Sequence, residues 1–89
     1  MAQILVNPDT LRAKASDVRN YRNQHDEIIT RLKALVSGLN ETWQGNAQTA
    51  FVSSFEGMQS TFTQFSELLE DYAKTMESFA NKMETEDRL

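Results

Sequence analysis

The sequence predicts an all-α fold: an antiparallel two-helix hairpin with a Trp-x-Gly turn, which dimerises into a four-helix bundle. Two amphipathic segments, about residues 8–39 and 46–84, repeat their apolar residues at helical spacing. A short stretch at about residues 40–45 separates them and contains the single tryptophan of the chain. At 89 residues the chain has room for one small domain, which we place at residues 1–89.

Composition excludes several kinds of function. The chain has no cysteine, which excludes disulfides and thiolate metal sites. Its net charge of −4 argues against a nucleic-acid partner. No apolar run approaches the ~20 residues that span a bilayer, so we expect no stable membrane insertion. The first eight residues lack a basic region and a small-residue cleavage site, so we expect no Sec-type signal peptide, and export by another route stays open.

The first helix has a clear start signal. Asn7 is a favoured N-cap residue, Pro8 suits the first helical position, and Asp9 adds a negative charge to the first turn. We expect residues 1–6 to form an extended or frayed arm. The apolar positions of this helix then recur at heptad spacing, interrupted by Lys14 near its start and His25 in its middle. Its candidate core and dimer residues are Leu11, Val18, Tyr21, His25, Ile28, Leu32 and Leu35.

The elbow between the helices has two possible starting points. Either Gly38 caps the first helix, or the first helix runs to Leu39 and ends at Asn40. We expect Asn46 to be the N-cap of the second helix. Between them, a tryptophan and a glycine occupy the bend at Trp43 and Gly45. We expect Trp43 to plug the gap between the helices, and Gly45 to supply backbone freedom.

The second helix has the more regular pattern, because its apolar residues alternate four and three positions apart. Gly57 lies off this line, where it costs ~1 kcal/mol relative to alanine, and we expect the helix to continue through it. We expect the pattern to end after Met83 and residues 84–89 to form a frayed tail. The candidate core and dimer residues here are Phe51, Phe55, Met58, Phe62, Phe65, Leu69, Met76 and Phe79, with Tyr72 on the same pattern.

Charge is distributed unevenly between the two halves. Residues 1–40 carry six basic and four acidic side chains, whereas residues 41–89 carry three basic and nine acidic ones. The halves therefore attract each other when packed side by side. Because surface ion pairs contribute only ~0–1 kcal/mol each, we expect them to bias helix pairing without driving folding.

The apolar stripes are wider than one neighbouring helix can cover. Ile29 and Val36 in the first helix, and Val52 and Leu68 in the second, are expected to remain outside the hairpin seam. Small scaffolds of this kind usually complete their core by association. We therefore predict an elongated dimer of two hairpins, formed with a second copy or with a similar chain.

These features together resemble the WXG family of ESAT-like proteins, the substrates of type VII secretion systems. The similarity covers essentially the whole chain, with the Met-Ala-Gln-Ile start, the helix entry at Asn7-Pro8 and Leu11-Arg12 just after it. Phe65 followed by Leu68-Leu69-Glu70 is also similar to the family's second helix. The most specific part is the tryptophan–glycine elbow at Trp43-Gln44-Gly45, followed by Ala50-Phe51 and Phe55.

The resemblance implies a non-enzymatic protein without a cofactor or metal. Family members form homodimers, or heterodimers with a sister WXG protein. They leave the cytoplasm folded, through the type VII secretion ATPase and without a cleaved signal peptide. Some act as effectors, and others are adaptors, co-secreted or intracellular, that target a larger toxin to the machinery. Both roles remain open from the sequence.

One family feature is an imperfect match. The export signal of the family is Tyr-x-x-x-Asp/Glu near the end of the second helix. Here Tyr72 is followed four residues later by Met76, and Glu77 comes one residue late. That shift rotates the acid by about 100° on a helix, and a partner that supplies the signal is the alternative. A looser hydrophobic version is formed by Met83 and Asp87.

Several residues have a second interpretation. Trp43 and Gly45 are a docking surface for the secretion ATPase or a structural plug and turn, and we favour the structural role. His25 is a pH switch or a packed core histidine, and we favour packing. The acidic residues Glu67, Glu70, Asp71 and Glu77 are more typical of a solvated face than of catalytic carboxylates. A generic coiled-coil dimerisation module is a remote alternative.

Overall fold

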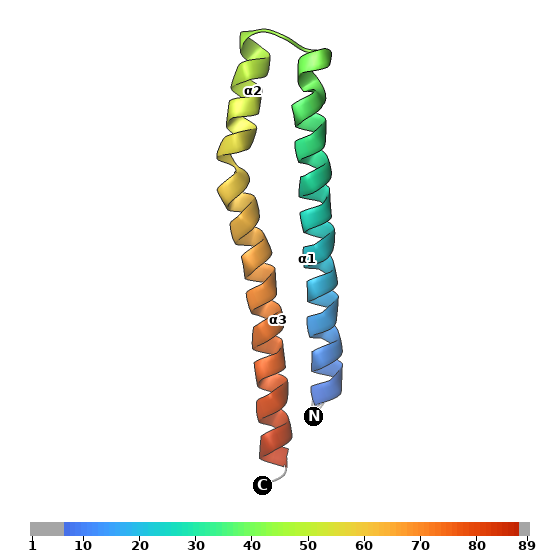
Figure 1. Cartoon of the computed structure of the whole chain (residues 1–89). Coiled ribbons are helices and arrows are strands. Elements are labelled where there is room, and N and C mark those ends of the chain that lie inside the picture. Colours follow the sequence, from blue (N-terminus) through green and yellow to red (C-terminus); the bar gives the residue numbers. More distant parts are fainter. Residues whose placement is uncertain (1–6, 88–89) are drawn as a thin grey trace, which may run out of the picture.

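The computed structural model describes residues 7–87 and shows an elongated helical hairpin (Figure 1). Helix α1 (Pro8–Ser37) leads through a short 3-10 helix, η1 (Gly38–Glu41), to the elbow. The chain returns through α2 (Asn46–Gly57) and α3 (Gln59–Asp87), and it has no strand within the described residues. The molecule measures 67 × 24 × 17 Å. The expected arm at residues 1–6 and the end of the expected tail at residues 88–89 lie outside the described residues.

The start of α1 is as predicted. Asn7 is the N-cap, and its side-chain oxygen accepts a hydrogen bond from the backbone N–H of Asp9 at 2.7 Å. Pro8 occupies the first helical position. The helix ends at Ser37 with Gly38 as its C-cap, so the first predicted end is confirmed and an α-helix running to Leu39 is wrong. The backbone continues in a tighter 3-10 turn from Gly38.

The elbow depends on one unusual glycine conformation. Gly45 has φ 123° and ψ −177°, a region that is essentially accessible only to glycine. It is also the N-cap of α2, and its carbonyl accepts a hydrogen bond from the backbone N–H of Thr49 at 3.1 Å. The prediction that Asn46 is the N-cap is therefore wrong, because Asn46 is the first residue inside the helix. No atom would contact a Cβ at position 45, so the requirement is conformational rather than steric.

The second helix is interrupted, and the expectation that it continues through Gly57 is wrong. It ends at Gly57 and restarts at Gln59, with Met58 between the two segments at φ −89° and ψ −3°. The N–H of Met58 donates to the carbonyl of Phe55 at 3.0 Å, which tightens the last turn. Glycine weakens a helix by ~1 kcal/mol relative to alanine, so an interruption costs least at this point.

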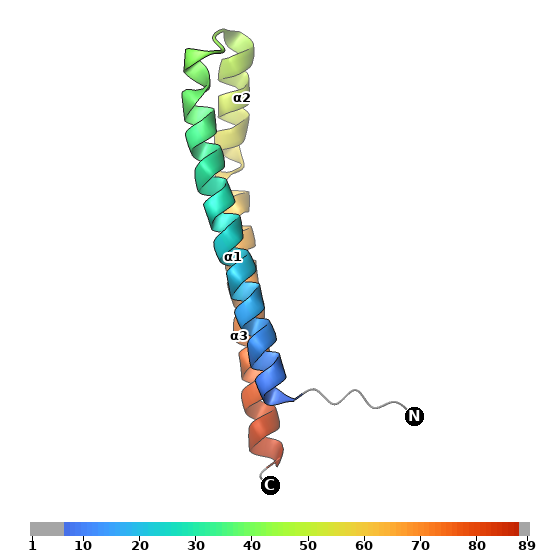
Figure 2. The same ribbon diagram turned by 90° about the vertical axis from the view of Figure 1, so that its right-hand side faces the viewer.

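The end of the chain also differs from the expectation. Helix α3 continues to Asp87, so the predicted fraying at residues 84–87 is wrong. Glu84 binds Arg12 of α1 through two hydrogen bonds of 2.6 and 3.1 Å. These bonds tie the last turns of α3 to α1, and Figures 1 and 2 show the two helices side by side at this end of the molecule.

Small side chains form the seam of the hairpin. Ala15 of α1 and Ala73 and Ala80 of α3 are fully buried, and Val36 is only 5% exposed. The expectation that Val36 lies outside the seam is wrong, and Ile29 and Val52 are half-buried as well. Alanine lets two helices approach closely, so α1 and α3 pack through these alanines, whereas Val36 lies beside Val52 and Phe55 of α2. The larger apolar residues beside the seam are thereby directed outward.

Candidate functional site

The predicted core and dimer residues divide into two sets in the structure. The half-buried set flanks the seam and contains Leu11, Val18, His25, Phe55, Phe62, Leu69 and Met76. The second set is exposed. We call this set, together with Leu68 and Tyr72, the apolar stripe. Its members are between 37% and 61% exposed, and they are Tyr21, Ile28, Leu32, Leu35, Phe51, Met58, Phe65, Leu68, Tyr72 and Phe79.

Both helices contribute to the same edge of the hairpin. The ring of His25 in α1 contacts Phe65 in α3 with centroids 5.1 Å apart, which places the two apolar lines next to each other. His25 thus packs against an aromatic ring, and its Nδ1 lies 3.2 Å from a carboxylate oxygen of Asp26. The stripe therefore draws residues from both helices on the edge where His25 meets Phe65.

The opposite edge carries an ion-pair ladder, formed by Arg12, Arg19 and Arg22 with Glu70, Glu77 and Glu84. Arg19 binds Glu77 through two hydrogen bonds of 2.6 and 2.8 Å and reaches Glu70 at 3.0 Å. Arg22 also binds Glu70. On α1, Tyr21 of the stripe follows Arg19 by two residues, about 200° around the helix. The ladder and the stripe therefore face in opposite directions.

The ladder shifts the pKa of its members in the direction that keeps them charged. Hydrogen bonds from Arg19 lower the pKa of both Glu70 and Glu77 below the ordinary value of 4.5. Hydrogen bonding to Glu84 raises the pKa of Arg12, and hydrogen bonding to Glu77 raises that of Arg19. A general acid needs a raised carboxyl pKa, so this arrangement suits helix pairing and not acid catalysis.

The two residues of the imperfect export motif lie in different environments. Tyr72 is 53% exposed on the apolar stripe. Glu77 is half-buried and is engaged by both guanidinium nitrogens of Arg19. Because Glu77 belongs to the ladder, the two side chains are on opposite edges of the hairpin and form no joint surface. Met83, of the looser version, is half-buried beside the seam.

At the elbow, Trp43 is partly exposed and packs on the first turns of α2. It is 38% exposed, and its ring lies 5.8 Å from that of Phe51. Its backbone N–H donates to the carbonyl of Leu39 at 2.7 Å. Gly45 then turns the chain into α2. Trp43 and Gly45 thus build the turn and still present an aromatic surface at the tip of the hairpin.

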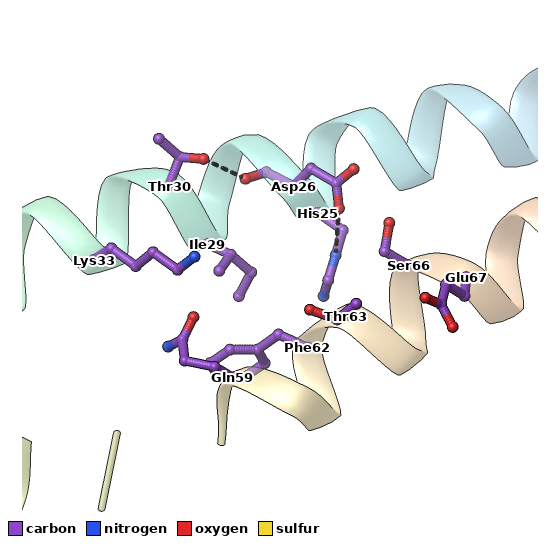
Figure 3. A pocket seen from close by; sticks show the side chains of 10 residues that line it. All are labelled: His25, Asp26, Ile29, Thr30, Lys33, Gln59, Phe62, Thr63, Ser66 and Glu67. Carbon is purple, nitrogen blue, oxygen red and sulfur yellow. Dashed lines mark hydrogen bonds and ion pairs between the residues drawn. The ribbon is translucent and has the colours of Figure 1, made fainter. Parts of the chain in front are cut away.

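A groove lies between the helices on the ladder side, and we call it the back groove. It has two neighbouring hollows of about 250 and 330 Å³ that share Lys33 and Gln59. Figure 3 shows the first hollow, with Ile29 and Phe62 directed between the helices and Lys33 and Glu67 at the rim. The residues that line the first hollow are His25, Asp26, Ile29, Thr30, Lys33, Gln59, Phe62, Thr63, Ser66 and Glu67. The second is lined by Lys33, Val36, Ser37, Val52, Phe55, Glu56 and Gln59.

The structural roles of two residues, Gln48 and Arg22, were not predicted from the sequence. Gln48 is 7% exposed and donates to the side chain of Asn40 at 2.6 Å, which ties α2 to the 3-10 turn. No pattern in the sequence indicates this bond. Arg22 lies in the seam with its Nε atom buried and unpartnered. Its spacing of seven residues from Ala15 and Ile29 is a signal that identifies its position.

Residues 7–87 contain no group of His, Cys, Asp and Glu that could hold a metal ion. Within the same residues, no helix has the length and apolar character needed to cross a membrane. The surface features described above are the apolar stripe, the elbow tip and the back groove.

Comparisons with known proteins agree on one family. The model of WXG100, described as proteins of 100 residues with WXG, matches residues 3–88. Protein YukE of Bacillus subtilis is 31% identical over 88 residues, covering 96% of this chain and 88% of the relative. The type VII secretion system extracellular protein A of Staphylococcus aureus is 25% identical, with 99% of this chain and 91% of the relative covered.

A solved structure matches the hairpin over its full length. The secreted protein EsxB of Bacillus anthracis superposes with a TM-score of 0.83 at 25% identity, covering 98% of this chain and 99% of that one. The fold predicted from the two amphipathic segments is thus shared with a secreted protein.

Proposed function

The chain belongs to the WXG100 family, and from this membership we propose that it is a small, non-enzymatic substrate of a type VII secretion system that acts through a helical-bundle dimer. It is cytoplasmic before export and leaves the cell folded, without a cleaved signal peptide. Support for export comes from its similarity to an extracellular type VII protein and to a secreted protein along nearly the entire chain. Its partners are the secretion ATPase and a second WXG chain.

The apolar stripe is the observation that carries the dimer. Large apolar residues of both helices, such as Ile28, Phe65 and Phe79, are more than 45% exposed along one edge of the hairpin. A contiguous exposed patch of this kind marks an interaction surface. Pairing two stripes buries them in the centre of a four-helix bundle. The partner is a second copy, or a sister WXG protein with a similar stripe.

Mass in dilute solution tests the dimer. We expect twice the chain mass of 10.2 kDa by analytical ultracentrifugation. The double variant Ile28→Lys, Phe65→Lys places charges on the stripe and should yield a monomer. The matched control Ser16→Lys, Ser60→Lys changes exposed positions outside the stripe and should leave the mass unchanged. A folded wild-type monomer that pairs only with a sister chain would indicate a heterodimer, and one that pairs with neither would refute the dimer.

Export is tested by the amount of this protein in culture supernatant, with and without the secretion ATPase. We expect the protein outside the cell only when the ATPase is present, while a cytoplasmic marker stays inside. Its presence outside the cell regardless of the ATPase would contradict the type VII route. Its absence under all conditions would contradict export.

The environment of Glu77 favours a second candidate function, an adaptor that targets a larger toxin and is co-secreted or stays in the cytoplasm. Arg19 holds Glu77 on the ladder edge, away from Tyr72, so the residues of the imperfect export motif are not presented together. A partner that carries its own signal then supplies the missing element. Deleting the neighbouring toxin gene distinguishes the two functions: export should persist for an autonomous substrate and cease for a co-exported adaptor.

A further inference from the structure

The back groove begins where the ion-pair ladder ends. Along α1, Asp26 and Lys33 continue at seven-residue spacing the line that contains Arg12 and Arg19. The return segment shows the same spacing. Thr63 of α3 and Glu56 of α2 continue, at intervals of seven residues, the line that contains Glu84, Glu77 and Glu70. The groove is therefore on the ladder edge, and pairing through the apolar stripe leaves it open.

The floor of the groove repeats after one heptad. Ile29 and Phe62 lie in the first hollow, and Val36 and Phe55 lie in the second. Val36 follows Ile29 by seven residues on α1, and Phe55 of α2 precedes Phe62 of α3 by seven residues across the break at Met58. Seven helical residues rise about 10.5 Å, so the hollows match residues i and i+7 of a third helix laid along the groove. An amphipathic helix has apolar side chains at this spacing, and such helices bind by placing those side chains into a groove.

The interruption of the second helix lies beside both hollows. Gln59, the first residue of α3, lines each of them. Helix α1 packs mainly on α3, and Figure 1 shows a wider separation between α1 and α2 than between α1 and α3. The break at Met58 thus places the widened part of the hairpin at the groove.

The rim of the groove carries an excess of negative charge. Asp26 and Glu67 line the first hollow and Glu56 the second, and Lys33 is the single lysine or arginine among the residues that line them. Among residues 7–87, neither Glu56 nor Glu67 has an ion-pair partner, in contrast to the carboxylates of the ladder. A hydrogen bond from Ser66 lowers the pKa of Asp26, which keeps its carboxylate charged. Charge complementarity therefore selects a basic partner.

We propose that the back groove is a docking site for a basic amphipathic helix of a partner protein. The helix presents apolar residues at i, i+3 or i+4, and i+7 to the groove floor, and lysine or arginine side chains to Glu56 and Glu67. This site is separate from the apolar stripe, and its occupation does not depend on secretion. A dimer paired through its stripes would carry two such grooves facing outward.

The test uses a stapled synthetic helix of about 20 residues with leucines at heptad spacing and flanking lysines, titrated into the isotope-labelled full-length protein and followed by NMR. We expect saturable shifts at amides along the groove, such as Thr30, Lys33 and Thr63, and none at Ile28 or Tyr72 of the stripe. A matched peptide with glutamates in place of the lysines should bind at least about tenfold more weakly.

Variants of the protein measure how much the carboxylates of the groove contribute to binding of the lysine peptide. Glu56→Lys and Glu67→Lys should each weaken binding of the lysine peptide by about tenfold or more. Asp71→Lys makes the same charge change at an exposed position on α3 outside the groove, and it should alter binding by less than about twofold. Circular dichroism of each variant separates lost binding from lost folding.

Three outcomes would overturn the proposal. The first is the absence of saturable binding by the lysine peptide to the folded protein. The second is a set of shifts confined to the apolar stripe, which would show that the peptide substitutes for the dimer partner. The third is movement of the groove amides when the protein concentration alone is raised, which would assign the groove to a second copy of this chain.

Discussion

Arg19 and Glu77 form a bidentate ion pair across the hairpin, with Nη1 2.6 Å from Oε2 and Nη2 2.8 Å from Oε1. The Nη2 atom of Arg19 also lies 3.0 Å from Oε2 of Glu70, which precedes Glu77 by seven residues on α3. A planar guanidinium that binds two successive carboxylates fixes the register of α1 against α3. The attraction expected between a basic first half and an acidic second half is confirmed by these pairs.

The ladder predicts a loss of stability in acid. The pKa values of Glu70 and Glu77 are lower in the folded protein than the ordinary value of 4.5. Their contribution is therefore complete above the unfolded-state pKa and is lost as the pH falls through the folded-state pKa. We expect the urea midpoint to be constant between pH 6 and 7 and to fall below about pH 4.5.

Variants of the ladder separate its contribution from general acid effects. Glu77→Gln removes the titrating group and should flatten the decline in acid, whereas Glu67→Gln, outside the ladder, should not. Arg19→Gln should lower the midpoint at pH 7 more than Arg31→Gln, because Arg31 makes only a local pair with Glu27 on the outer face of α1. Equal effects of the two arginine variants would show that the ladder does not determine helix register.

Gly45→Ala should destabilise the hairpin by about 1–3 kcal/mol, because alanine is strained at φ 123° and ψ −177°. Gly57→Ala is the matched control, since no backbone strain or steric contact opposes it, and it should stabilise by about 0.5–1 kcal/mol. Urea unfolding at constant protein concentration measures both. A neutral Gly45→Ala variant would contradict the role assigned to this glycine.

The alanine seam predicts a steric limit. Ala73 is fully buried against α1, so Ala73→Leu should overpack the seam and cost about 1–3 kcal/mol. Ala34→Leu adds the same atoms at an exposed position of α1 and should change stability by no more than about 0.5 kcal/mol. Thermal unfolding distinguishes them. Tolerance of leucine at position 73 would mean that the helices are not in close contact there.

Trp43 allows structural and docking roles to be separated. Trp43→Ala removes the contact with Phe51 and should cost about 1–2 kcal/mol, less than for a fully buried tryptophan because the side chain is 38% exposed. Trp43→Phe keeps an aromatic ring and should recover most of that stability. Export assays on both variants complete the test, since lost export with unchanged stability would favour docking to the ATPase.

The sequence predicted the hairpin well because its helical signals are local. The N-cap at Asn7, the proline after it and the heptad spacing all act within a few residues of one another. The break at Met58 was missed, because the cost of one glycine is small and gives no indication of whether the helix will continue. The continuation of α3 to Asp87 was missed because it is supported by a contact between Arg12 and Glu84, which are far apart in the sequence.

The sequence by itself determined the helical class, the two long segments, the elbow and the presence of an apolar face wider than one helix can cover. Only the tertiary structure decided which apolar residues face inward. Periodicity places residues on a face of a helix, but rotation of that face depends on what the opposite helix offers. Here Ala15 of α1 and Ala73 and Ala80 of α3 are fully buried, and their small side chains allow α1 and α3 to pack closely. Close packing of small residues therefore forms the seam, and the larger side chains remain outside it as the apolar stripe.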